Sequence, residues 1–77
     1  LGMVDKAEQL LLDLGFHQVR VRIHGDIARI EVLPDEIERL VSGENREKIY
    51  SYLKQLGFSY VTLDLGGYRM GSMNETL

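Results

Sequence analysis

Two segments of this 77-residue chain repeat the same succession of residues, and the repeat limits the possible folds more than any other feature. Each segment ends an apolar helical pattern with a Leu-Gly-Phe triplet, at residues 14–16 and 56–58, and then changes to an alternating pattern. Glycine after a helix favours the left-handed conformation that ends it, and alternation of apolar and polar residues is typical of a strand. The repeat therefore predicts one domain built on two helix-to-strand units.

Between the two units the sequence predicts a β-hairpin. Residues 17–24 and 27–32 alternate, and Gly25-Asp26 supplies a two-residue turn with glycine in the first central position. This turn sets a register in which Arg22 lies opposite Arg29 and Arg20 lies opposite Glu31. In this register all apolar residues of the hairpin except Ile27 lie on the core side. They are Val19, Val21, Ile23, Ala28, Ile30 and Val32.

The remaining segments complete a small α+β fold. The first helix is predicted over residues 4–14, a short helix begins near Pro34, and a longer one spans residues 46–56 with Asn45 as its cap. The last strand lies within residues 58–65 and turns Val61, Leu63 and Leu65 inward. The order α-β-β-α-α-β describes a two-layer sandwich, with a three-stranded sheet and helices on one face. It resembles a ferredoxin-like half without its first strand, and the strand order stays open.

Composition excludes several classes of function. The chain has no cysteine, which removes disulfides, thiolate metal sites and thiol nucleophiles, and His17 and His24 have no grouped carboxylates, so no metal site is expected. The net charge of −3 disfavours nucleic acid as a partner. No apolar run approaches the roughly 20 residues that span a bilayer, and the first residues do not form a signal peptide pattern. We expect no membrane partner and a cytoplasmic location.

The polar side of the hairpin is unusually cationic. It collects Arg20, Arg22, His24, Arg29 and Glu31, and like charges directly opposite each other, as at Arg22 and Arg29, cost about 0.2–1 kcal/mol. Three guanidinium groups against one carboxylate leave an excess that a phosphate or a substrate carboxylate would neutralise with bidentate geometry. The pattern therefore predicts an anion site. The alternative interpretation is a solvated face with an ion pair between Arg20 and Glu31.

The C-terminal segment, residues 66–75, has the composition of a loop that approaches a ligand. It combines glycines with Arg69, Ser72 and Asn74, which offer close backbone approach and hydrogen-bonding side chains. The alternative is a strap in which Tyr68 and Met73 cover the sheet.

Two motifs resemble a known family, and the resemblance covers nearly the whole chain. The hairpin reads Arg-x-Arg-x-His-x-Asp-x-Ala-Arg-x-Glu over residues 20–31, and the C-terminal segment reads Gly-Tyr-Arg-x-Gly-Ser-Met-Asn over residues 67–74. Together with residues 14–16 and 60–65, they resemble the C-terminal domain of the ATP-dependent sacrificial sulfur transferases, the LarE family of the PP-loop ATP pyrophosphatases.

The resemblance implies a two-domain enzyme in which an N-terminal PP-loop domain binds ATP and Mg²⁺ and adenylylates a substrate carboxylate before sulfur transfer. In that family the substrate is a pyridinium mononucleotide, and the product feeds a nickel-pincer cofactor. Residues carried over as substrate-side contacts are Arg20, Arg22 and Glu31, followed by Arg29, Asp26, Arg69, Ser72 and Asn74.

The chain also departs from the family pattern, since it has no Ser-Gly-Gly-x-Asp-Ser nucleotide loop and no cysteine that could give up sulfur. We therefore expect residues 1–77 to be a single substrate-binding and oligomerisation domain that binds no cofactor and is not catalytic alone. Its expected partners are the N-terminal domain, further copies of the full-length protein and a small anionic substrate. The alternative is a stand-alone protein-interaction module.

Overall fold

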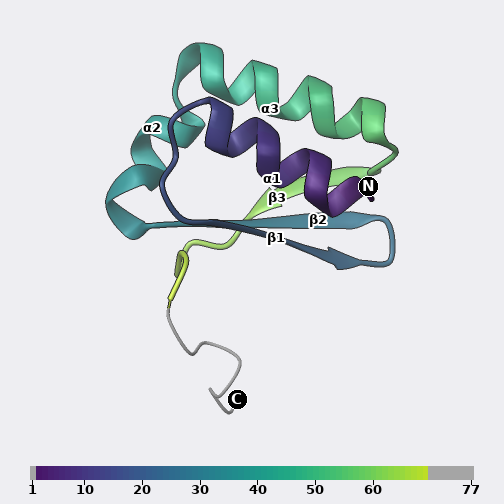
Figure 1. Ribbon diagram of the computed structural model, residues 1–77, viewed down its shortest axis with the longest axis horizontal. Helices are drawn as coiled ribbons and strands as arrows, with labels where there is room; N and C mark the ends of the chain where they lie inside the picture. The colour runs from purple at the N-terminus through teal and green to yellow at the C-terminus, as the bar shows by residue number, and fades with distance from the viewer. Residues whose placement is uncertain (1, 70–77) are drawn as a thin grey trace.

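The elements follow the order that the sequence predicts. The computed structural model describes residues 2–69, and Figure 1 shows their arrangement. In chain order they are α1 (Met3–Asp13), β1 (Val19–His24), β2 (Ile27–Val32), the 3₁₀ helix η1 (Pro34–Glu36), α2 (Ile37–Val41), α3 (Gly43–Leu56) and β3 (Tyr60–Leu63). The predicted α-β-β-α-α-β sandwich is confirmed.

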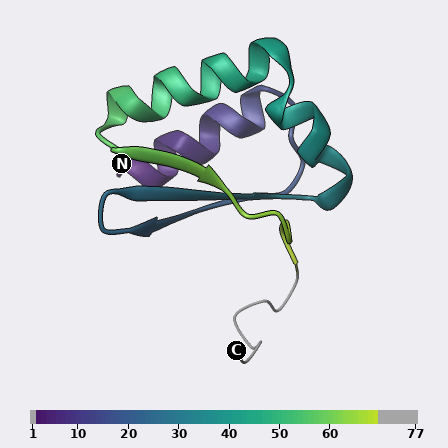
Figure 2. The same ribbon diagram turned by 180° about the vertical axis from the view of Figure 1, so that it is seen from behind.

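The three strands form one mixed sheet in the order β1-β2-β3. Strands β1 and β2 are antiparallel in the expected register, which pairs Arg22 with Arg29 and Arg20 with Glu31. Strand β3 runs parallel to β2, because the chain crosses over through α2 and α3 before it returns to the sheet. Figures 1 and 2 show that the helices lie on one face of the sheet, so the opposite face of the strands carries no helix.

Both Leu-Gly-Phe triplets end their helices with the same hydrogen bonds. After α1, Phe16 N–H donates to Leu11 O (3.1 Å) and Gly15 N–H donates to Leu12 O (3.0 Å). After α3, Phe58 N–H donates to Leu53 O (3.2 Å) and Gly57 N–H donates to Lys54 O (3.0 Å). This is the Schellman pattern, which requires a positive φ at the glycine, and the values are 98° and 118°. The repeat therefore directs two phenylalanines into the core.

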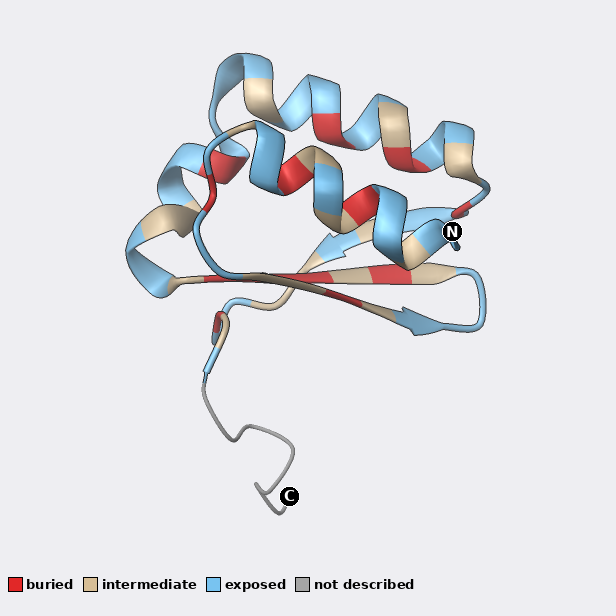
Figure 3. Ribbon diagram, viewed as in Figure 1, coloured by how far each residue is buried: buried red, intermediate tan, exposed pale blue. Residues whose placement is uncertain are grey.

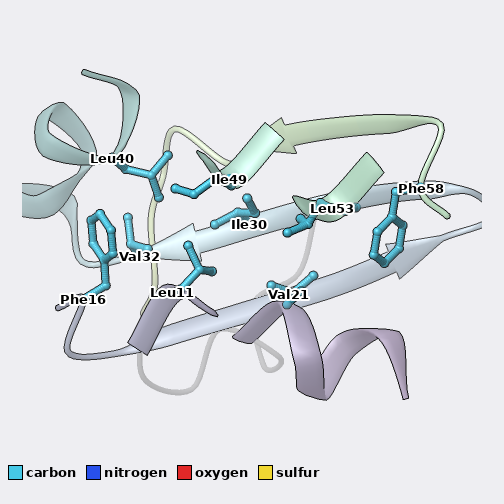
Figure 4. Close-up of a cluster of buried hydrophobic side chains, with 11 residues drawn as sticks. Leu11, Phe16, Val21, Ile30, Val32, Leu40, Ile49, Leu53 and Phe58 are labelled. Atoms are coloured by element: carbon cyan, nitrogen blue, oxygen red, sulfur yellow. The ribbon is translucent and has the colours of Figure 1, made fainter. Parts of the chain in front are cut away.

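The core fills the space between the helices and the sheet. Figure 3 shows the buried positions on the inner sides of α1 and α3 and along the central strand, and Figure 4 shows the side chains that meet there. The buried apolar residues are Ala7, Leu11, Phe16, Val21, Ala28, Ile30, Val32, Leu40, Ile49, Leu53 and Phe58. They come from both helix-to-strand units and the hairpin, so the units share one core.

Two apolar residues that the sequence predicts to point inward are exposed. Leu65 is 81% exposed because β3 ends at Leu63 and the chain then enters a turn. Ile23 is 45% exposed because it lies next to the last residue of β1, at the hairpin end of the sheet. Alternation alone predicts on which face of the sheet a residue lies, but not whether the helices extend far enough to cover it.

The predicted cap of the long helix is wrong. Helix α3 begins at Gly43, and Ser42 precedes it in an extended conformation without a side-chain capping bond. The Asn45 amide instead donates to Arg39 O (3.1 Å), and the Ser42 hydroxyl donates to the same oxygen (2.9 Å). Both polar residues therefore join the start of α3 to the end of α2.

Glu36 at the end of η1 and Arg39 of α2 bind the loop between α1 and β1. One carboxylate oxygen accepts a bond from His17 N–H (3.2 Å), and the other lies 2.8 Å from His17 Nδ1. Arg39 stacks on the Phe16 ring (4.0 Å) and donates to Leu14 O and Gly15 O. Partial burial opposes ionisation of Glu36, but the hydrogen bonds from His17 and the charges of His17 and Arg39 outweigh it and lower the Glu36 pKa below its usual 4.5.

This lowered pKa predicts an acid-sensitive contribution to stability. A carboxylate with a depressed pKa in the folded state stabilises the fold above its unfolded pKa, and this stability is lost as the pH falls through the folded pKa. We expect Glu36→Gln to cost about 0.5–1.5 kcal/mol near neutral pH, and less as the pH falls below about 4. Urea unfolding across the pH range measures both, with exposed Glu38→Gln as control. A cost that stays constant with pH would contradict the assignment.

Candidate anion-binding face

The face of the sheet without helices is referred to here as the open face, and the hairpin register fixes which residues lie on it. Residues that pair across strands share a face, and successive residues alternate between faces. The open face therefore carries Arg20, Arg22 and His24 from β1, Ile27, Arg29 and Glu31 from β2, and Tyr60 and Thr62 from β3. The three arginines, named the arginine cluster below, lie on two neighbouring strands.

Glu31 lies between two members of the arginine cluster, Arg22 and Arg29. It is 4% exposed, although no helix covers this face. Its Oε2 atom lies 3.6 Å from Arg22 Nε and 3.5 Å from Arg29 Nη2. Because Arg22 and Arg29 are cross-strand partners, this single carboxylate offsets the repulsion between the two guanidinium groups.

A second carboxylate joins the cluster from the residue that directly follows β3. Asp64 Oδ2 lies 3.6 Å from Arg29 Nη1, and Asp64 N–H donates to Ile30 O (2.9 Å), which holds the residue against β2. The sequence did not single out Asp64 as a site residue. Asp64 alternates with the inward-facing residues of the strand in the same way as Tyr60 and Thr62, which indicates the side of the open face. Its contact with Arg29, however, requires β3 to lie beside β2, and the local sequence pattern does not determine the order of the strands.

The cluster retains unused hydrogen-bonding capacity. Arg22 Nε and Arg29 Nε are buried, and neither has a hydrogen-bond acceptor in the described part of the chain. The 3.6 Å from Arg22 Nε to Glu31 exceeds ordinary hydrogen-bond length. The side chains of Arg22 and Arg29 are still 31% and 38% exposed, so a small molecule can reach their outer N–H groups.

Arg20 does not make the ion pair with Glu31 that the alternative interpretation assigned to it. Its guanidinium carbon instead lies 5.6 Å from the centroid of the Tyr68 ring. The chain reaches this position through a turn in which Gly67 has a φ of 78°, and a Cβ on Gly67 would lie only 2.8 Å from Val32 O. Tyr68 N–H then donates to Val32 O (2.6 Å). The segment after β3 thus returns to the end of β2.

Two further predicted site residues, Asp26 and Arg69, lie outside strands β1, β2 and β3. Asp26 is exposed in the hairpin turn, where its backbone oxygen accepts a bond from Ser59 N–H (2.8 Å). Arg69 is exposed beside the Gly66 turn, where its guanidinium carbon lies 3.5 Å from the position of a Cβ on Gly66. Ser72 and Asn74 lie outside the described residues. The structure therefore brings together Arg20, Arg22, Arg29 and Glu31, which lie on paired strands.

A separate apolar pocket of about 390 Å³ lies between α2, α3 and β3. Its walls include Leu40, Ile49, Val61 and Leu63, and none of its lining residues belongs to the arginine cluster.

Across the part of the chain that the structure describes, His, Asp and Glu side chains form no group of three that could hold a metal ion. Over the same residues, every helix is too short or too polar to cross a bilayer.

Fold and site together define a small α+β domain with an arginine-rich open face on a three-stranded sheet. The resemblance seen in the motifs extends over all 77 residues, which are 49% identical to pyridinium-3,5-bisthiocarboxylic acid mononucleotide synthase of Lactiplantibacillus plantarum, a LarE sulfur transferase. They are also 42% identical to the uncharacterized protein slr1717 of Synechocystis sp.. The chain spans only 27% and 29% of these two relatives. No protein-family model matches it.

Proposed function

We propose that this chain is the substrate-binding domain of an ATP-dependent sulfur transferase of the PP-loop class. In this proposal the open face contacts the phosphate or a carboxylate of a pyridinium mononucleotide. The identity of 49% to a pyridinium-3,5-bisthiocarboxylic acid mononucleotide synthase supports the substrate class. The single observation that carries the anion site is the arginine cluster, in which Glu31 and Asp64 pair with Arg22 and Arg29, while no carboxylate among residues 2–69 pairs with Arg20.

The arginines act in this site by charge and position. A guanidinium group stays protonated at any physiological pH, so it serves neither as a general acid nor as a general base. It offers N–H groups in a plane that match two oxygens of a phosphate or carboxylate. Glu31 and Asp64 hold Arg22 and Arg29 in place before the anion arrives, which reduces the conformational entropy that binding must offset.

The remaining chemistry belongs to parts of the protein outside this chain. The sequence has no Ser-Gly-Gly-x-Asp-Ser loop for ATP and no cysteine as a sulfur donor. In the proposed enzyme an N-terminal PP-loop domain binds ATP and Mg²⁺ and activates the substrate carboxylate, and the protein works as a homo-oligomer in the cytoplasm. Its product would feed synthesis of a nickel-pincer cofactor.

Titration with inorganic phosphate tests the anion site. We expect amide and guanidinium NMR signals of Arg20, Arg22 and Arg29 to shift together at millimolar phosphate. Arg22→Ala should weaken phosphate binding about 10- to 150-fold, since a hydrogen bond to a charged group contributes roughly 1.5–3 kcal/mol. Arg46→Ala is the matched control because Arg46 is exposed on α3, away from the open face. Wild-type affinity in Arg22→Ala would remove Arg22 from the site.

The alternative function, a protein-interaction module, has its own supporting observation. Val41 and Tyr50, which line the apolar pocket, are 44% and 50% exposed, and β3 is an edge strand of the described sheet. Exposed apolar patches beside an edge strand are typical of interaction surfaces. No signal change at millimolar phosphate would favour this alternative.

A further inference from the structure

We infer that Tyr68 is a positioning residue of the anion site, and that it keeps Arg20 available as the first guanidinium group to meet the incoming anion. This inference rests on the proposed function, because it assigns a role within the same site. Its basis is the different surroundings of the three arginines on the open face.

Arg20 is the member of the cluster that no carboxylate neutralises within residues 2–69. Glu31 is its direct cross-strand partner, yet Glu31 pairs with Arg22 and Arg29. Asp64 also pairs with Arg29. Within residues 2–69, the guanidinium group of Arg20 instead contacts the ring of Tyr68, with 5.6 Å between the guanidinium carbon and the ring centroid. The positive charge of Arg20 is therefore the least compensated of the three.

An aromatic ring holds a guanidinium group differently from a carboxylate. A carboxylate accepts hydrogen bonds at the N–H edge, which is the same edge that a phosphate requires. A ring attracts the flat face of the cation and leaves the N–H groups in the plane free. Tyr68 can therefore restrain Arg20 without occupying the donors that an anion needs.

The backbone fixes the place of the Tyr68 ring. Tyr68 N–H donates to Val32 O (2.6 Å), which is one residue beyond Glu31 on β2. The preceding Gly67 is buried against Val32 O and Pro34, where a Cβ would come within 2.8–3.1 Å of these atoms. The turn thus anchors the ring at the end of the strand that carries Glu31, within cation–π range of the Arg20 guanidinium group.

Two substitutions at Tyr68 separate the ring from its hydroxyl group. Tyr68→Leu removes the ring, and we expect it to weaken binding of inorganic phosphate about two- to fivefold, which corresponds to a cation–π contribution of roughly 0.5–1 kcal/mol. Tyr68→Phe keeps the ring and should retain wild-type affinity. NMR titration measures both affinities, and thermal unfolding of each variant shows that the domain remains folded.

A second readout does not depend on the ligand. In the free protein, the side-chain signals of Arg20 should carry a ring-current shift that disappears in Tyr68→Leu and persists in Tyr68→Phe. Should Tyr68→Leu fail to fold, Tyr68→Met replaces it, because methionine fills the site with an apolar side chain but has no ring. That variant should weaken phosphate binding to a similar extent.

The outcomes distinguish this inference from the proposed function. A wild-type protein that shows no phosphate-dependent shifts would remove the anion site and the role of Tyr68 in it. Normal phosphate binding in both wild type and Tyr68→Leu would overturn the inference while the proposed function stands. Equal weakening in Tyr68→Phe and Tyr68→Leu would also overturn it, because the hydroxyl group and not the ring would then be responsible.

Discussion

Replacing Leu53 by alanine is expected to destabilise the fold by about 2–5 kcal/mol, because truncation of a buried leucine removes apolar contacts and leaves a cavity. Leu53 is 0% exposed, and its backbone oxygen accepts the bond from Phe58 that ends α3. The side chain lies between α3 and the sheet, where both layers contribute to the core (Figure 4). Relaxation of a single element therefore cannot close the cavity.

The expected loss is large against the total stability of a domain of this size, which is about 5–15 kcal/mol. Thermal unfolding should show a melting temperature lower by roughly 8–40 °C, since each kcal/mol shifts it by about 4–8 °C in a small domain. Leu65→Ala is the matched control, because Leu65 is 81% exposed and its truncation should leave the melting temperature almost unchanged. Equal effects of the two substitutions would contradict the assigned core.

Glu31→Gln should destabilise the protein and make its stability depend on phosphate. The substitution keeps the shape of the side chain but removes the charge that lies 3.5–3.6 Å from two guanidinium groups. Removing one partner of a fully buried ion pair costs about 3–5 kcal/mol. Both arginines are about one third exposed, and water screens part of the repulsion, so we expect a loss of roughly 1–2 kcal/mol.

Phosphate should return part of this stability, because an anion that binds the folded state takes over the missing negative charge. Urea unfolding of Glu31→Gln at about 20 mM phosphate, compared with sodium chloride of equal ionic strength, separates binding from screening. The exposed Glu38→Gln serves as the control for loss of a carboxylate. Equal recovery in both salts would show that the cluster repels itself but has no anion site.

The hairpin shows which structural features the local sequence pattern can predict. Alternation and the Gly25-Asp26 turn determine the register, and the register places the three arginines and Glu31 on one face. The repeated Leu-Gly-Phe triplets determine where α1 and α3 end, because only a residue with positive φ completes the Schellman bonds. These features depend on neighbours along the chain or across one tight turn, and the sequence therefore contains them.

Other features depended on segments that are distant in sequence. Asp64 reaches Arg29 because the crossover through α2 and α3 places β3 beside β2, and several strand orders share the same local pattern. Arg20 turns to Tyr68 and leaves Glu31 to Arg22 and Arg29, because the Gly67 turn returns the chain to Val32. The sequence by itself determined which residues gather on the open face. The tertiary structure decided which of them pair, since ion pairing depends on distances between strands that no local pattern fixes.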